Sequence, residues 1–110
     1  MRAYMIDEIS SSHMEDIIDF LKKNAIKSNL DQIFWVRLPE DLLSKTQFQH
    51  PSCKPHVFAV ELGRDWIKLE LFVRTLESMQ CTCPGYCTPQ QREFVINFAD
   101  GMIERLGITT

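Results

Sequence analysis

The chain has 110 residues, of which 45% are hydrophobic and 25% charged, and it contains four glycines and five prolines. This length suits one hydrophobic core, and the composition is typical of a folded globular protein, so we predict a single domain over residues 1–110. The formal net charge is −3, and Lys22, Lys23 and Lys27 form the only basic cluster, which argues against a nucleic-acid partner. Because acidic residues interrupt the N-terminal stretch and no apolar run approaches the roughly 18 residues of a membrane span, we expect a cytoplasmic protein without a membrane partner.

The first predicted element is an amphipathic helix over residues 12–26. Ser12 and Glu15 have the spacing of a capping box, and apolar residues then recur at helical intervals between charged ones. Residues 32–38, QIFWVRL, are rich in β-branched and aromatic side chains and are followed by proline, which predicts a strand. Residues 39–45 are expected to make one or two helical turns, and the TQFQHPSCKP stretch that follows, with its two prolines, a loop.

Residues 56–62 and 66–76 predict an antiparallel hairpin. Placing Leu62 opposite Asp65 gathers the apolar side chains of both strands on one face of the sheet. This register leaves a two-residue loop that starts with Gly63, as a type II′ turn prefers.

The same register places Cys53 level with Arg74. The start of the first hairpin strand must lie beside the end of the second, and Cys81, Cys83 and Cys87 follow soon after that end. We therefore expect all four cysteines at the same end of the sheet.

The last predicted element is a helix that starts after Thr88 and ends at Gly107. Thr88 and Gln91 have capping-box spacing, and Pro89 stands at the first helical position. The predicted order is helix, strand, strand, strand, helix. This order predicts an α+β fold of two layers, with a small antiparallel sheet of about three strands and both helices packed on one face.

The cysteines are the strongest functional signal in the sequence. Cys53, Cys81, Cys83 and Cys87 match the ligand count of a structural zinc site or a small iron–sulfur cluster. Residues 83–86, Cys-Pro-Gly-Tyr, have the sequence of a type II turn, which would reverse the chain between two of the sulfurs. We therefore predict a metal- or cluster-binding module whose site is mainly structural or serves a protein interaction, with zinc favoured slightly over iron.

The histidines near the cysteines differ in their expected roles. His50 is a substitute metal ligand, because it lies in the proline-containing loop that carries Cys53. His56 falls on the apolar face of the predicted hairpin, where a hydrogen-bonded core histidine is expected.

Two alternatives remain open, and so does the question of whether the protein is an enzyme. Cys87 stands just before a helix N-cap, where backbone amides favour a thiolate, so the protein can instead be a thiol-based redox or sulfur-transfer protein with Cys83 or Cys81 as the resolving thiol. It can also be a metal-free interaction domain that forms a homodimer through Trp66 and Phe72. The sequence contains no phosphate-binding glycine loop and no familiar hydrolase motif.

Overall fold

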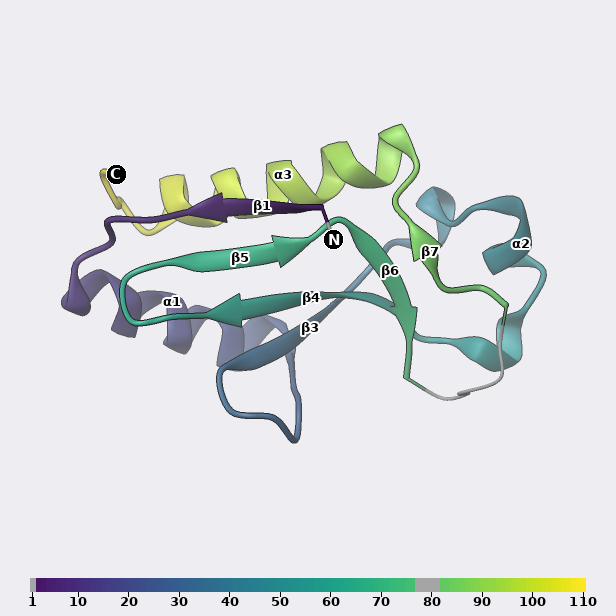
Figure 1. Ribbon diagram of the computed structural model, residues 1–110, viewed down its shortest axis with the longest axis horizontal. Helices are drawn as coiled ribbons and strands as arrows, with labels where there is room; N and C mark the ends of the chain where they lie inside the picture. The colour runs from purple at the N-terminus through teal and green to yellow at the C-terminus, as the bar shows by residue number, and fades with distance from the viewer. Residues whose placement is uncertain (1, 77–81) are drawn as a thin grey trace.

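The computed structural model describes residues 2–76 and 82–110, and within these residues the fold is a seven-stranded antiparallel sheet with three α-helices (Figure 1). The strands are β1 (Ala3–Ile6), β2 (Ile26–Lys27), β3 (Ile33–Arg37), β4 (His56–Leu62), β5 (Ile67–Glu70), β6 (Phe72–Thr75) and β7 (Gly85–Tyr86). The helices are α1 (Ser11–Asn24), α2 (Lys45–Phe48) and α3 (Pro89–Arg105), with short 3-10 turns η1 (Glu40–Leu42) and η2 (Pro51–Cys53).

The main sheet has the strand order β1-β5-β4-β3-β2, while β6 pairs with the start of β4 and with β7. The predicted α+β class is confirmed, but the predicted sheet of about three strands with two helices is wrong. The missed strands β1, β2 and β7 have only two to four residues each, so they lack a periodic pattern and exist because a neighbouring strand pairs with them. The missed helix α2 lies in the stretch that we expected to be a loop.

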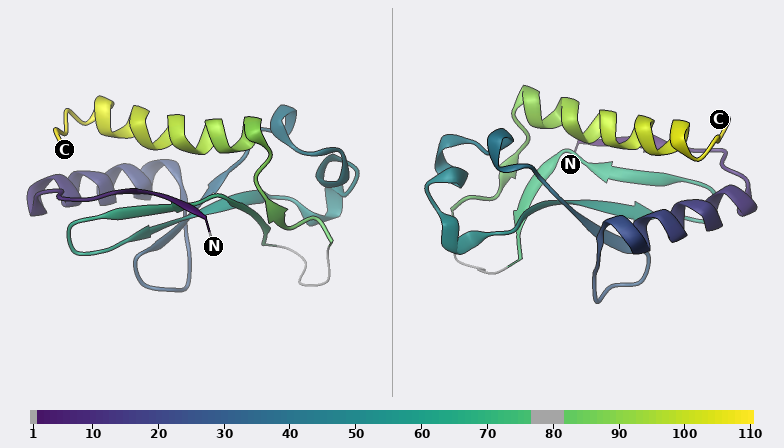
Figure 2. Two further views of the ribbon diagram at one scale, coloured as in Figure 1. Left: turned by 45° about the horizontal axis from the view of Figure 1, so that its top comes forward. Right: turned by 180° about the vertical axis from the view of Figure 1, so that it is seen from behind.

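Both long helices lie on the same side of the sheet (Figure 2). Between them and the sheet is the hydrophobic core, in which the side chains of Phe58, Val60, Ile67 and Leu69 are fully buried. These are the residues that the predicted hairpin placed on one face, and each buried side chain of this size stabilises the fold by about 1.5–3 kcal/mol. The helices contribute Met14, Ile17 and Leu21 from α1 and Val95, Ala99 and Met102 from α3.

The hairpin register differs from the prediction by two residues. Leu62 pairs with Ile67, and the backbone N–H of Gly63 donates to the Trp66 carbonyl at 2.8 Å, so the loop consists of Arg64 and Asp65. Because the shift is an even number of residues, every side chain stays on its predicted face. Gly63 does not need a positive φ here: a Cβ atom at this position would lie 2.0 Å from the Trp66 ring, so its glycine makes room for the indole.

After β5 the chain bends at Leu71, and β6 then pairs with β4 in a second register. Val57 faces Arg74 and His56 faces Thr75, so the predicted pairing of Cys53 with Arg74 is wrong. Cys53 lies beyond the sheet, at the end of η2.

The start of α1 also differs from the prediction. Its N-cap is Ser10, whose side chain accepts a hydrogen bond from the backbone N–H of His13, and not Ser12. The start of α3 is as predicted, because Thr88 and Gln91 form both hydrogen bonds of a capping box.

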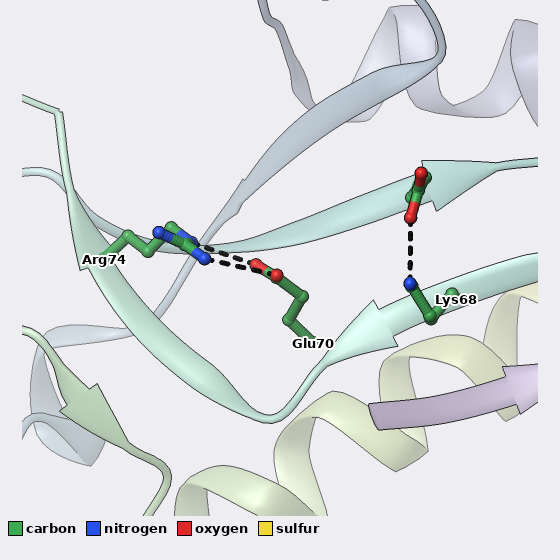
Figure 3. A network of polar contacts seen from close by, with 4 residues as sticks. Lys68, Glu70 and Arg74 are labelled. Atoms are coloured by element: carbon green, nitrogen blue, oxygen red, sulfur yellow. Dashed lines mark hydrogen bonds and ion pairs between the residues drawn. The ribbon is translucent and has the colours of Figure 1, made fainter. Parts of the chain in front are cut away.

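Ion pairs occupy the face of the sheet that is turned away from the helices (Figure 3). The Lys68 ammonium lies 3.1 Å from a carboxylate oxygen of Glu61, and the Arg74 guanidinium donates to both carboxylate oxygens of Glu70, at 2.9 and 3.2 Å. The exposed Lys68–Glu61 pair contributes little to stability, and both pairs keep this face polar.

Candidate functional site

The described cysteines lie near one end of the molecule, around α2, η2 and β7 (Figure 1). Cys53 and Cys83 are buried and Cys87 is half-buried. Cys53 is part of a disulfide bond, whereas Cys83 and Cys87 are in the thiol form. The fourth predicted site residue, Cys81, lies outside the described residues.

Burial opposes ionisation of both thiols. It raises the pKa of Cys83, and it raises the pKa of Cys87 although the Arg92 guanidinium acts in the opposite direction. An attacking thiol needs a lowered pKa, so this environment does not favour Cys87 as a nucleophile at neutral pH. The predicted type II turn at residues 83–86 is wrong, since Gly85 and Tyr86 are extended and form β7 against β6.

Within residues 2–76 and 82–110, no group of three or more His, Cys, Asp or Glu side chains is placed to hold a metal ion. A disulfide sulfur is not a thiolate, so a site with four cysteine ligands would first require reduction of the disulfide at Cys53. His50 uses its ring Nδ1 in a 2.6 Å hydrogen-bond contact with the Thr46 carbonyl. The predicted zinc or iron–sulfur site therefore stays a prediction.

Two buried glutamines hold this end of the fold together. Gln47 and Gln91 are each the third helical residue of a capping box, at the starts of α2 and α3. The Gln91 Nε2 donates to the Gln47 Oε1 at 2.8 Å and to the Leu42 carbonyl at 2.9 Å, and the Gln47 Nε2 donates to the Cys83 carbonyl at 3.2 Å. Because buried polar groups are costly unless they are paired, this network fixes the start of α3 relative to α2 and the cysteine stretch.

A cavity lies elsewhere, between α1 and α3. It is an open cleft with a volume of about 630 Å³, within the range of small-molecule sites. One face of α3 forms a wall, because Phe94, Asn97, Phe98 and Arg105 are spaced at helical intervals that place them together. The opposite wall is the last turn of α1, with Phe20, Lys23 and Asn24, and the β2–β3 edge supplies Ala25, Ile26, Trp35, Val36 and Arg37.

Aromatic rings supply part of the apolar surface of this cleft, which is otherwise mixed in character. The Phe20 ring of α1 and the Phe98 ring of α3 meet with centroids 6.3 Å apart, and Phe98 packs edge-on against Phe58 of β4 at 5.8 Å. Phe94 packs edge-on against the same Phe58 ring at 6.3 Å. Phe20, Phe94 and Phe98 are only partly buried, so they offer apolar surface to the cleft.

Three cationic residues are among those that line the cleft. Lys23, Arg37 and Arg105 line the cleft, no acidic side chain among the described residues lines it, and none of the three forms an ion pair within that part of the chain. This is a local reversal of sign in a protein whose formal net charge is −3. A concave apolar surface beside positive charge is the complement of an anion with an apolar body.

Gly101 lies in the middle of the α3 wall. A Cβ atom at this position would meet no other atom within 4 Å, so packing inside the chain does not require a glycine here. Glycine in a helix interior costs about 0.5–1 kcal/mol relative to alanine. Its effect is to leave the cleft wider at its centre.

The sequence prediction missed this cleft. Its residues come from α1, β2, β3 and α3, and only the fold brings Lys23, Arg37 and Arg105 to one place. The available signals were a polar Asn97 and a glycine, Gly101, on the same face of α3 as Phe94 and Phe98.

No protein-family model, curated protein or solved structure matches the chain. Among the described helices, none combines the length and the apolar character needed to cross a lipid bilayer.

Proposed function

We propose that this protein binds a small amphiphilic anion, an apolar or aromatic body carrying a carboxylate or phosphate group, in the cleft between α1 and α3. The observation that carries the proposal is the convergence of Lys23, Arg37 and Arg105 on an aromatic cavity of about 630 Å³ that no described acidic side chain lines. The apolar body would lie against Phe20 and Phe98, and the anionic group would face the cations at the rim.

Helix dipoles explain only part of this charge pattern. Lys23 and Arg105 are in the last turns of α1 and α3, where a positive side chain interacts favourably with the helix C-terminus. Each helix terminus carries about half a unit of negative charge, so two termini offset about one of the three positive charges. Arg37 is in strand β3, so a helix dipole does not account for its positive charge at the cleft.

A probe series with one apolar body tests the charge preference. Decanoate, decan-1-ol and decyltrimethylammonium share a ten-carbon chain and differ in charge. Trp35 lines the cleft and also a cavity beside Glu61 and Arg74, whereas Trp66 lies at the hairpin turn. Fluorescence of a Trp66→Phe variant therefore reports on the surroundings of Trp35. We expect saturable binding in the order decanoate, decanol, decyltrimethylammonium, with affinity falling about fourfold for each methylene removed from the anion.

Single substitutions on the rim test the residues. Arg37→Gln and Arg105→Gln should each weaken decanoate binding about two- to fivefold, as expected for exposed charges, and should leave decanol binding unchanged. Lys22→Gln is the matched control for Lys23→Gln, because Lys22 is exposed on the same helix turn but does not line the cleft. Equal affinity for all three probes, or an equal effect of Lys22→Gln and Lys23→Gln, would refute the proposal.

The cysteine-based functions stay separate predictions. Elemental analysis for zinc and iron, with a thiol count after anaerobic purification, tests the predicted site of Cys53, Cys81, Cys83 and Cys87. About one zinc or stoichiometric iron would support it, and rapidly reacting thiols without metal would favour the redox alternative. A cytoplasmic location also stays a prediction.

Dimerisation through Trp66 and Phe72 is likewise a prediction. Both side chains are half-buried: the indole packs over Gly63, and Phe72 packs edge-on against Tyr86 with centroids 5.3 Å apart. Sedimentation at high concentration, with Trp66→Ala for comparison, tests it.

A further inference from the structure

Strand β1 is the outermost strand at one edge of the main sheet (Figure 1). It pairs with β5 on one side, and within residues 2–76 and 82–110 no strand pairs with its other side. Met5, in the middle of β1, is apolar and yet 51% exposed. The backbone groups of an open sheet edge are available for pairing with a strand of another chain.

The hydrogen bonds to β5 show which peptide groups face this open edge. In an antiparallel pair, the N–H and C=O groups of one residue point to the same side, and successive residues alternate. The Arg2 carbonyl accepts a hydrogen bond from the backbone N–H of Leu71 at 3.0 Å, so Arg2 and the even-numbered residues that follow it in β1 face β5. The peptide groups of Ala3 and Met5 therefore face outward, where they meet no other described strand.

β1 lacks the features that usually protect an edge strand. Such strands are commonly very short, or carry a charged residue or a proline. The other described edge strands, β2 and β7, have two residues each, and β2 contains Lys27. β1 has four residues, Ala-Tyr-Met-Ile, with neither a charge nor a proline, and Ala3 and Met5 are exposed. Among the described edge strands, β1 is thus the best suited to pair with another strand.

Charged residues of opposite sign flank β1. Arg2 precedes the strand, and Asp7 and Glu8 follow it. All three are exposed, and none forms an ion pair within the described part of the chain. Two antiparallel copies of this strand place the basic end of one beside the acidic end of the other, whereas two parallel copies would bring like charges together. The segment is therefore complementary to a second, antiparallel copy of itself.

We infer that β1 pairs antiparallel with β1 of a second copy of this chain, so that two main sheets join across a two-fold axis. Because the odd-numbered residues face the open edge, the hydrogen bonds form only between odd-numbered residues of the two copies. The register centred on Met5 meets this condition and places Ala3 opposite Asp7 of the second copy. It also places Arg2 opposite Glu8 of the second copy, at both ends of the pairing.

Other registers match the charges less well. A shift by two residues in one direction would place Arg2 opposite the apolar Ile6. A shift in the other direction would move Arg2 past Glu8, where the extended segment ends because Glu8 has a positive φ of 56°. The Asp7 carbonyl already accepts a hydrogen bond from the Thr110 hydroxyl, so the Asp7 N–H is the group left for the second copy. The paired segment is short, and we expect a weak, reversible dimer.

Charge reversal tests this register. Sedimentation equilibrium at protein concentrations up to about 1 mM measures the dissociation constant of the dimer. Arg2→Glu and Glu8→Arg should each raise this constant at least about tenfold, because each variant places like charges opposite one another at both ends of the pairing. An equal mixture of the two variants should associate as the wild type does, since one chain is then acidic at both positions and the other is basic.

Two controls have the same changes of charge elsewhere. Lys22 and Glu15 are exposed on α1, so Lys22→Glu and Glu15→Arg should leave the dissociation constant unchanged. Equal effects of these controls and of the β1 variants would overturn the inference, and so would a mixture of Arg2→Glu and Glu8→Arg that stays monomeric.

Amide hydrogen exchange locates the contact. The Met5 N–H gains a hydrogen bond in the dimer, so its exchange should slow as the protein concentration rises, and Arg2→Glu should remove this dependence. The Tyr4 N–H already faces β5 in the monomer and should change less. A protein that stays monomeric at about 1 mM, or Met5 exchange that is independent of concentration, would overturn the inference. So would a dimer that Trp66→Ala abolishes and Arg2→Glu leaves intact. The inference does not depend on the proposed function, because β1 does not line the cleft.

Discussion

Replacing Gly101 should separate the stability of this protein from its binding capacity. Gly101 lies inside α3, is exposed, and has no atom within 4 Å of the position that a Cβ would take. Gly101→Ala therefore adds a methyl group without a clash and reduces the conformational entropy of the unfolded chain. We expect the free energy of unfolding to rise by about 0.5–1 kcal/mol, which for a domain of this size raises Tm by roughly 2–5 °C.

Gly101→Leu should give the opposite result for ligand binding. Leucine is also a good helix former, so the helix should remain at least as stable as in the wild type. Its side chain would extend into the cleft between Asn97 and Arg105, which line the same wall. We expect decanoate affinity to fall at least about tenfold, a loss of about 1.4 kcal/mol of binding free energy.

Urea denaturation and fluorescence titration of the same two variants provide the assay. Glu104→Leu is the control, because it adds the same side chain to an exposed α3 position outside the cleft and should leave decanoate binding intact. A destabilised Gly101→Ala protein would show that the environment of this glycine is not the one described. Full decanoate affinity in Gly101→Leu would refute the cleft as the binding site.

Four further predictions concern other parts of the fold. Gln91→Leu should lower the free energy of unfolding by about 2–4 kcal/mol in urea titrations, because it leaves buried backbone groups unpaired; a loss below about 1 kcal/mol would contradict this. Gly63→Ala should destabilise by about 1–3 kcal/mol in the wild type and much less in a Trp66→Ala background, as a double-mutant cycle would show. Since the pKa of His56 is lowered on folding, the unfolded chain binds the proton more tightly, so stability should fall as pH drops below about 6.5, and His56→Gln should reduce this dependence in urea titrations at several pH values. Cys87 should react slowly with iodoacetamide at neutral pH, because burial raises the pKa of its thiol, and rapid labelling of the folded protein would contradict this.

The sequence predicted correctly those features that depend on interactions between residues close together in the chain. The capping box of Thr88 and Gln91 forms as predicted, because all of its groups lie within four residues. The same device, Ser44 with Gln47, starts α2, but the two prolines that follow made the stretch resemble a loop. A capping box was thus the better guide there than proline content.

The pairing of strands that are distant in the sequence could not be predicted from local sequence patterns. The alternation of apolar residues predicted which hairpin side chains share a face, but it could not distinguish registers that differ by two residues. Trp66 settled the register by packing over Gly63, which moved the loop to Arg64 and Asp65. Similarly, β7 depends on β6, so a Pro-Gly sequence that usually turns became a strand at Gly85.

The cleft follows from how the two long helices share one face of the sheet. Two helices on the same face can close the seam between them with leucine or alanine, and such a seam would be part of the core. Here the facing positions are Asn97, Gly101 and Arg105 on α3 and Lys23 on α1, which are poor material for a closed core. The two helices contact each other through the rings of Phe20 and Phe98. Beside this contact, the space between the helices stays open as the cleft. The four residues at the facing positions are exposed, so the seam is open to solvent there, and the ligand that we propose would occupy this opening.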